Sequence, residues 1–186
     1  MAEAYIIDAV RTPVGKRGGG LSRAHSADLG AHVISALMAR TGVDPGAVED
    51  VIFGCCDTIG PQAGDIARTC WLAAGLPQHV PGVTIDRQCG SSQQSVHFAA
   101  QGVLSGTSDL IVAGGVQNMS MIPLASAMTV AAQFGFTTLM SGDSSLAQAS
   151  TTDANASLIS IASICSIFMP VFFRAWRTAG IGAVSM

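Results

Sequence analysis

The chain has little charge and no excess of positive residues. Asp, Glu, Lys and Arg make up 11% of its 186 residues, and the formal net charge is -3 at pH 7. Surfaces that bind nucleic acid or anionic membranes need clustered Lys and Arg, so the composition argues against both partners. Hydrophobic residues make up 49% of the chain. Such a share beside so little charge favours a protein whose surfaces are covered by a partner subunit or by further chain.

The cysteines lack the spacing of a metal site or of a disulfide framework. The chain has five cysteines, an odd number. Zinc sites typically have a Cys-x-x-Cys pair near a second pair, and this arrangement does not occur in the sequence. Reduced thiols, no bound metal and a reducing compartment are therefore expected. The chain also lacks the basic and then apolar order of a signal peptide, because Glu3 and Asp8 lie near its start. We therefore expect a cytoplasmic protein.

Strand and helix patterns alternate from residue 5 to about residue 138. Short apolar runs predict strands at 5–7, 51–54, 83–85 and 110–115, and amphipathic stretches predict helices at 26–40, 65–74 and 93–104. Ser26 is the expected N-cap of the first helix, and Gly42 is its expected end. Alternation at this spacing predicts an α/β fold with a mostly parallel sheet that helices cover on both faces.

The composition changes near Leu139, which divides the chain into a domain at 1–138 and a tail at 139–186. The tail is rich in Ser and Ala and then apolar, and its run of 16 apolar or small residues at 158–173 contains three serines and a proline. That run is short for a membrane-spanning helix of about 20 residues. The favoured interpretation is an out-of-frame or disordered segment, with a membrane-associated tail and a functional C-terminal module as the alternatives.

Cys89 is the main candidate for chemistry. It lies in the run TIDRQCGSSQQ at 84–94, between a predicted strand and a predicted helix. A thiol at a helix N-terminus is next to unpaired backbone N–H groups and the positive end of the helix dipole. Both favour the thiolate, which is the nucleophilic form. Strand, turn, nucleophile and helix in this order are typical of acyl-transfer sites.

Other residue patterns have simpler interpretations. The glycine-rich run at 15–20 lacks the spacing of a phosphate-binding loop and predicts a flexible turn. Arg87 is expected either to hold the thiolate or to contact a second subunit. Cys55, Cys56 and Cys70 are interpreted as small core residues. None of the four histidines can be assigned as a base; His97 is about 12 Å of helix rise away from Cys89, and the others are His25, His32 and His79.

Four ordered stretches around Cys89 resemble the thiolase family, whose members make or cleave 3-ketoacyl-CoA. They are DAVRTPVGK at 8–16 with GGL at 19–21, AAGLP at 73–77 with VPGVT at 80–84, the cysteine run itself, and DLIVAGG at 109–115 with NMS at 118–120. The resemblance covers residues 5 to about 125. It implies an incomplete first domain of the thiolase fold, with Cys89 as the acyl-thioester nucleophile. Met119 resembles a family position near the acyl pocket, although a methionine after a strand is also common in a core.

The resemblance also implies a function. A thiolase moves an acetyl or acyl group between a cysteine and coenzyme A, in 3-ketoacyl-CoA thiolysis or in acetoacetyl-CoA formation, which are steps of fatty acid metabolism. Its substrates are coenzyme A thioesters, and it needs no bound cofactor or metal. The intact family forms homo-oligomers that pair through the first domain.

The chain departs from the family in several places. Ser92 stands where a glycine is common, and Gln117 stands where many members have Glu. The family's Gly-His-Pro, Cys-x-Gly-Gly-Gly and Asn-Glu-Ala-Phe motifs are absent, and Cys165 is followed by Ser-Ile-Phe. We therefore expect an acyltransferase impaired by truncation. The alternative is a non-catalytic thiolase remnant or an interaction partner of an intact thiolase, whereas the Arg-Thr-Pro opening argues against a related ketoacyl synthase.

Overall fold

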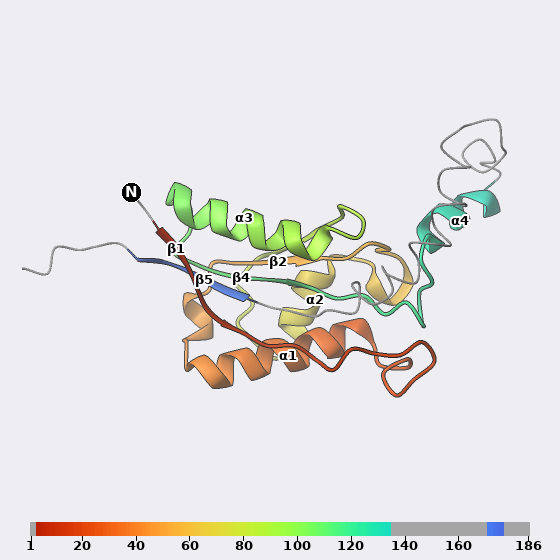
Figure 1. Cartoon of the computed structure of the whole chain (residues 1–186), viewed down its shortest axis with the longest axis horizontal. Helices are drawn as coiled ribbons and strands as arrows, with labels where there is room; N and C mark the ends of the chain where they lie inside the picture. The colour runs from red at the N-terminus through yellow and green to blue at the C-terminus, as the bar shows by residue number, and fades with distance from the viewer. Residues whose placement is uncertain (1–2, 135–170, 177–186) are drawn as a thin grey trace, which may run out of the picture.

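The computed structural model describes residues 3–134 and 171–176 (Figure 1). Along the chain these residues form β1 (Glu3–Ala9), α1 (Ser26–Thr41), the short 3-10 helix η1 (Pro45–Ala47), β2 (Asp50–Gly54), the 3-10 helix η2 (Gly60–Gln62), α2 (Ile66–Ala73), β3 (Gly82–Ile85), α3 (Ser91–Ser105), β4 (Leu110–Gly115), α4 (Ser126–Gln133) and β5 (Val171–Trp176). Most of the predicted tail, including its apolar run up to residue 170, lies outside the described residues.

The strands form one sheet in the order β1-β5-β4-β2-β3. β2 runs parallel to both β3 and β4, as the alternation of strands and helices predicts. β5 runs antiparallel to its neighbours β1 and β4. No strand was predicted at 171–176, because these residues were assigned to the tail. The division of the chain at residue 138 stays a prediction.

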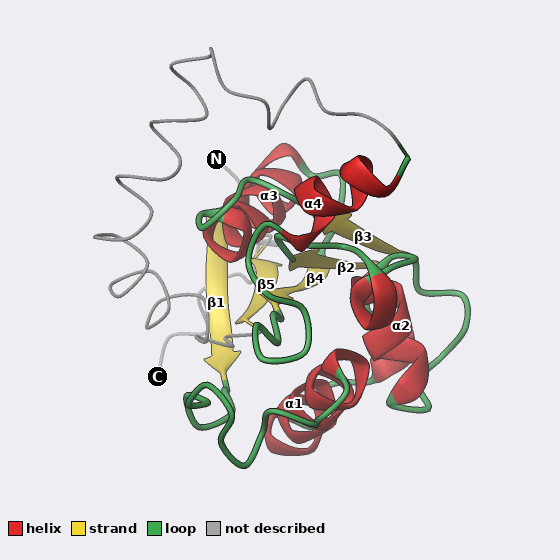
Figure 2. Cartoon of the chain, turned by 90° about the vertical axis from the view of Figure 1, so that its right-hand side faces the viewer, coloured by secondary structure: helices red, strands yellow, loops and turns green. Residues whose placement is uncertain are grey.

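Helices cover both faces of the sheet. α3 lies on one side, and α1 and α2 lie on the other (Figures 1 and 2). Successive side chains of a strand point to opposite faces, and β2 follows this rule: Val51 and Phe53 join the core under α1 and α2, whereas Ile52 joins Ala99 and Val103 of α3. The α/β fold with helices on both faces is therefore confirmed.

The start of α1 corrects a prediction. The N-cap is His25 rather than Ser26: the His25 ring nitrogen Nδ1 accepts a hydrogen bond of 3.1 Å from Ala27 N. Ser26 is instead buried, and its hydroxyl donates to Gln62 Oε1 at 2.9 Å. The predicted end is confirmed, because Gly42 adopts a left-handed conformation with φ of 63°. The glycine-rich run before α1 forms turns, as predicted.

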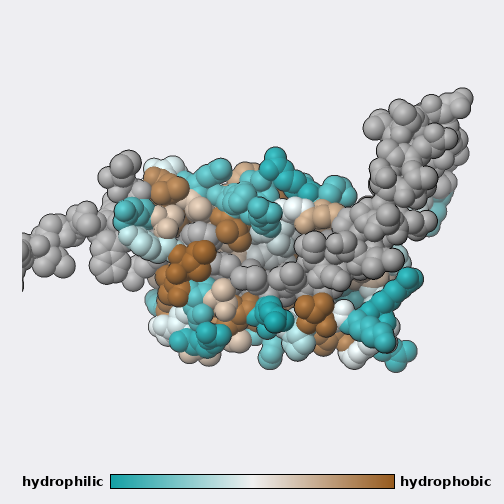
Figure 3. All heavy atoms as spheres, viewed as in Figure 1, coloured by the Kyte–Doolittle hydropathy of each residue, from teal (hydrophilic) through white to brown (hydrophobic). Residues whose placement is uncertain are grey.

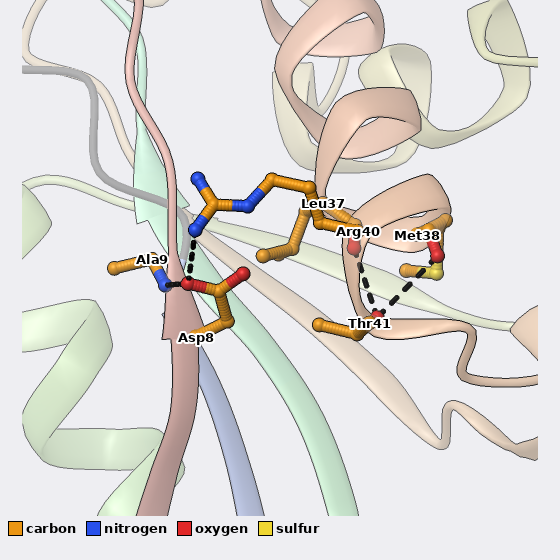
Figure 4. A network of polar contacts seen from close by, with 6 residues as sticks. All are labelled: Asp8, Ala9, Leu37, Met38, Arg40 and Thr41. Carbon is orange, nitrogen blue, oxygen red and sulfur yellow. Dashed lines mark hydrogen bonds and ion pairs between the residues drawn. The ribbon is translucent and has the colours of Figure 1, made fainter.

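An ion pair joins β1 to α1 (Figure 4). Arg40 Nη2 lies 3.0 Å from Asp8 Oδ1, and the Asp8 carboxylate also accepts from Ala9 N at 2.7 Å. The Arg40 side chain is 59% exposed, so the pair contributes at most about 1 kcal/mol. The apolar side chains of β1 reach the surface, where Figure 3 shows hydrophobic residues around this strand; Tyr5, Ile6 and Ile7 are 48%, 59% and 42% exposed.

Candidate active site

Cys89 lies in the turn between β3 and α3. β3 ends at Ile85, and α3 begins at Ser91, two residues earlier than predicted. The N-cap of α3 is Gly90, which makes no side-chain capping bond. Cys89 is exposed directly before this N-cap. The predicted order of strand, turn, cysteine and helix is therefore present.

The residue before the cysteine has an unusual backbone conformation. Gln88 has φ of 50°, in the left-handed region that costs a non-glycine residue about 1–2 kcal/mol. Its carbonyl oxygen accepts three hydrogen bonds, from Cys56 Sγ at 3.0 Å, Ser91 Oγ at 2.5 Å and Ser91 N at 3.0 Å. These bonds offset the cost of the conformation and fix the direction of the carbonyl.

The direction of the Gln88 carbonyl also determines that of the Cys89 N–H. A trans peptide unit is planar, so its C=O and N–H groups point in opposite directions. The carbonyl of Gln88 points toward Cys56 and the buried Ser91. The N–H of Cys89 therefore points away from them. A donor beside an exposed thiol is the arrangement that stabilises an oxyanion formed at that thiol.

Further hydrogen bonds complete the turn. Asp86 Oδ1 accepts from Gln88 N at 2.7 Å, and Ser91 Oγ accepts from Arg87 N at 2.8 Å. The Arg87 guanidinium donates to Gln94 Oε1 of α3. Arg87 thus has a partner within its own domain. Its two predicted roles, toward the thiolate or toward a second subunit, stay predictions.

The start of α3 packs directly on the ends of two strands. A Cβ on Gly54, the last residue of β2, would lie 2.3 Å from Ser91 C and from Ser92 N. A Cβ on Gly115, the last residue of β4, would lie 1.9 Å from Ser92 Oγ. Both strands therefore need glycine at their ends. The serine that departs from the thiolase pattern at position 92 occupies the space that Gly115 leaves open.

Two of the other cysteines are core residues, as predicted. Cys55 is 1% exposed and Cys70 is fully buried. Burial raises the pKa of the Cys55 thiol to about 12. Burial likewise raises the pKa of the Cys70 thiol to about 12. Both groups are therefore thiols at neutral pH and poor nucleophiles.

Cys56 has a different role, which sequence reasoning missed. It is half-buried rather than part of the core, and its thiol contacts the turn that carries Cys89. Its backbone N–H donates to Gln117 Oε1 at 3.1 Å, and Cys55 Sγ lies 3.2 Å from the same oxygen. Gln117, the second departure from the family pattern, thus holds the 55–56 segment, while its Nε2 is buried without a hydrogen-bond partner in the described part of the chain.

The four histidines have other positions. His25 caps α1, and His79 Nε2 lies 3.1 Å from Gly46 O. His32 and His97 are exposed on α1 and α3. Within residues 3–134 and 171–176, no hydrogen bond joins a histidine to Cys89, and the interpretation that none can be assigned as its base stays a prediction.

Met119 is half-buried in the turn that follows β4 and Asn118. No contact in the described part of the chain places it at Cys89, so its role at an acyl pocket stays a prediction. In the residues that the structure describes, no group of three or more His, Cys, Asp and Glu side chains suits a metal ion. No helix in that same part of the chain has the length and apolar character needed to cross a membrane.

Comparison with known proteins identifies the family. Residues 4–163 match the family model for the thiolase N-terminal domain. The steroid 3-ketoacyl-CoA thiolase FadA6 of Mycobacterium tuberculosis is 67% identical over 137 residues, which cover 74% of this chain and 34% of that protein. The 3-oxoadipyl-CoA/3-oxo-5,6-dehydrosuberyl-CoA thiolase of Escherichia coli is 44% identical over 124 residues, 66% of this chain and 31% of the relative.

A solved structure gives the same result. The crystal structure of the Bacillus anthracis acetyl-CoA acetyltransferase matches with a TM-score of 0.63 and 41% identity, over 66% of this chain and 31% of the other. The chain therefore spans about a third of the length of the relatives that it matches, 34% and 31% for the two thiolases above. On the family model, the sequence identities and the shared fold, the chain belongs to the thiolase family.

Proposed function

We propose that Cys89 accepts an acyl group from a coenzyme A thioester, as the nucleophile of a thiolase-type acyltransferase. One observation carries this proposal: the thiol is exposed directly before α3, and the carbonyl of the preceding peptide unit accepts hydrogen bonds from Cys56 and Ser91. The thiol and the adjacent N–H are then both available to one substrate carbonyl. The membership of the thiolase family supports the same assignment.

In the proposed step the Cys89 sulfur attacks the carbonyl carbon of the thioester. The new C–S bond forms as the carbonyl electrons move to oxygen, to which the Cys89 N–H donates. The bond to the coenzyme A sulfur then breaks, and coenzyme A leaves with one proton as the free thiol. The proton that Cys89 loses balances the one that coenzyme A gains, so the net change is exchange of one thioester for another.

A base must take the thiol proton. No histidine of the described residues is hydrogen-bonded to Cys89, so we assign to this chain only the acyl-accepting half-reaction, with a base from solvent or buffer. Acetyl and 3-ketoacyl thioesters are the proposed substrate class, because a similar solved structure is named an acetyl-CoA acetyltransferase and the relatives are named thiolases of 3-ketoacyl-CoA and 3-oxoadipyl-CoA. With a 3-ketoacyl thioester the Cys89 sulfur attacks the 3-keto carbonyl, the bond between C2 and C3 breaks, and C2 takes the proton, so that acetyl-CoA is the leaving group. We also propose a cytoplasmic homo-oligomer that needs no metal or other cofactor and binds neither nucleic acid nor membranes.

The test is the intact mass of the purified chain after incubation with acetyl-CoA. We expect one added acetyl group on the native chain and on Cys56→Ser, and none on Cys89→Ser. Peptide mapping then locates the group. A folded native chain that gains no acetyl group would contradict the proposal and would favour the alternative, a non-catalytic relative that acts through contacts with an intact thiolase.

A further inference from the structure

We propose that Ser91 and Cys56 are positioning residues that aim the backbone N–H of Cys89 at the reacting carbonyl. The proposal rests on the function proposed for Cys89 and extends it to two residues that touch no substrate. Both donate to one atom, the carbonyl oxygen of Gln88, at 2.5 Å from Ser91 Oγ and 3.0 Å from Cys56 Sγ. This oxygen and the N–H of Cys89 belong to the same planar peptide unit, so holding one orients the other.

The two donors come from different parts of the fold. Ser91 is the first residue of α3 and is 3% exposed. Cys56 follows β2, and its own position depends on Gln117 beyond β4, whose Oε1 accepts from Cys56 N at 3.1 Å. The peptide unit is therefore fixed against a helix and against the ends of two neighbouring parallel strands. A peptide held by three elements keeps its direction when the thiol reacts.

The conformation of Gln88 explains why such support is needed. A φ of 50° is unfavourable for glutamine, and the turn relaxes toward negative φ when its hydrogen bonds are removed. Ser91 holds the turn twice, because its hydroxyl donates to Gln88 O and accepts from Arg87 N at 2.8 Å. Loss of the Ser91 hydroxyl should therefore disturb the peptide more than loss of the Cys56 thiol.

Two reagents separate positioning from general damage to the site. p-Nitrophenyl acetate acylates the thiol through a tetrahedral oxyanion and releases p-nitrophenolate, while the thiol proton passes to the medium. Iodoacetamide alkylates the same thiol by displacement of iodide, and no oxyanion forms. Both need an exposed, ionised Cys89, but only acylation uses the N–H. The ratio of the two rates at Cys89, measured by peptide mass spectrometry on the full chain, therefore reports the direction of the peptide.

The experiment compares this ratio in the native chain and in matched variants. For Ser91→Ala we expect a fall of about tenfold, smaller than the roughly 10²–10³-fold cost of removing an oxyanion donor, because the N–H is misdirected and not removed. For Cys56→Ala a smaller fall of about threefold is expected, because the Ser91 bonds persist, and Cys56→Ser, which keeps a donor, should restore the ratio to within about twofold of the native value. Ser95→Ala is the control: that buried hydroxyl of α3 bonds Gly114 O and Ser92 O at 2.6 Å but not the turn.

Ser95→Ala should lower the melting temperature and leave the ratio unchanged. Equal ratios in Ser91→Ala, Cys56→Ala and the native chain would overturn the proposal, as would a native ratio no higher than that of glutathione. If Ser91→Ala does not fold, the ratio in Cys56→Ala compared with that in Cys56→Ser tests the proposal. If the native chain shows a high ratio but takes no acetyl group from acetyl-CoA, the proposed function alone is rejected. If it takes the acetyl group but the ratio is the same in these variants, the positioning roles alone are rejected.

Discussion

A Cβ on Gly115 would lie 1.9 Å from the hydroxyl oxygen of Ser92. The last residue of β4 and the first turn of α3 thus approach each other as closely as a glycine permits. The same Cβ would lie 2.7 Å from Gly54 O of β2. The helix that follows Cys89 is therefore fixed in place by two strand ends, and its starting point does not depend on a side-chain cap.

We predict that Gly115→Ala destabilises the protein by about 2 kcal/mol, which is typical of overpacking in a core. Adding Ser92→Gly should recover part of the loss, because it removes the serine atoms that the new methyl group meets at 1.9 and 2.9 Å. The recovery is partial, since the contact with Gly54 O remains. Thermal unfolding of the single and double variants measures both effects.

Gly20→Ala is the matched control for this substitution. A Cβ on Gly20 meets nothing within 4 Å, and its φ lies outside the left-handed region. Its melting temperature should match that of the native chain. A Gly115→Ala variant as stable as Gly20→Ala would contradict the tight contact between β4 and α3.

Alkaline pH should destabilise the fold through its buried thiols. Burial raises the pKa of both Cys55 and Cys70 from 9.0 to about 12. Below pH 9 these thiols are protonated in the folded and in the unfolded state, so their contribution to stability is fully present. Between pH 9 and 12 only the unfolded thiol ionises, and each thiol lowers the free energy of unfolding by about 1.4 kcal/mol per pH unit.

Urea unfolding at pH 8 and pH 10 under reducing conditions tests this prediction. Cys70→Ala should lose stability at pH 8 through the cavity it creates, yet show a smaller further loss at pH 10 than the native chain. Val103→Ala, which truncates a fully buried side chain without a titrating group, should lose the same amount at both values. An equal dependence on pH in Cys70→Ala and the native chain would contradict the effect of burial on Cys70.

Asn118 joins the end of β4 to the glycine-rich loop, and its amide is essential there. Its Nδ2 donates to three carbonyl oxygens, of Leu21 at 3.2 Å, Ser22 at 3.3 Å and Ala24 at 2.8 Å. Asn118→Asp has nearly the same shape but directs an oxygen at these acceptors. We predict a loss of about 3 kcal/mol at pH 7, from three broken bonds and a buried charge among acceptors.

The comparison with Asn118→Ala isolates the repulsion. Alanine loses these hydrogen bonds and also those that Asn118 Oδ1 accepts from Ser120 N at 3.1 Å and Met121 N at 3.2 Å, but it adds no charge. The stability of Asn118→Asp relative to Asn118→Ala should therefore fall between pH 4 and pH 7. The introduced carboxyl ionises more easily in the unfolded chain than among the carbonyl groups, so the penalty exists above pH about 4 and disappears below it. Chemical unfolding at pH 4 and pH 7 measures the difference. A stability difference between the two variants that is the same at both pH values would contradict this orientation of the amide.

The sequence predicted the elements of the site better than the contacts between them. The pattern of residues 83–104 predicts a strand, a turn and a helix, because each pattern reflects the burial of side chains within its own element. The helix ends at Gly42 and Gly106 can likewise be predicted from sequence, since a left-handed C-cap is a local property of the backbone. On this local basis Cys89 was placed at the start of a helix, where the structure has it.

The residues that support the turn were not predictable in the same way. Cys56 and Gln117 reach their partners across 32 and 61 positions of the chain, and no periodicity records such a contact. Adjacent to Cys55, Cys56 resembles a core cysteine in sequence, although its thiol faces a backbone carbonyl. Ser26 was assigned as a cap because its residue type is typical of one, whereas its hydroxyl is committed to Gln62. The role of such a side chain depends on which hydrogen-bond partner it meets in a distant segment of the chain.

Asp57 supports the start of α4 from a distant part of the chain, and its removal should loosen that helix selectively. The side chain is 4% exposed, and its oxygens accept from Ala125 N at 3.1 Å and Ala127 N at 3.0 Å. These are N–H groups at a helix N-terminus. A carboxylate there accepts hydrogen bonds from N–H groups that have no partner within the helix, and it interacts favourably with the positive end of the helix dipole. Asp57→Ala should cost about 1–2 kcal/mol, as the loss of a cap does.

Hydrogen exchange of the α4 amides measures this loss locally. Each 1.4 kcal/mol of local opening accelerates exchange about tenfold, so the amides of Ser126–Gln133 should exchange about tenfold faster in Asp57→Ala while those of α3 do not change. Asp44→Ala is the control, because the Asp44 side chain accepts from Gly46 N at 2.9 Å, at the short helix η1 and not at α4. If exchange becomes faster throughout the domain, or does not become faster in α4, Asp57 stabilises the fold by its burial alone and does not hold α4.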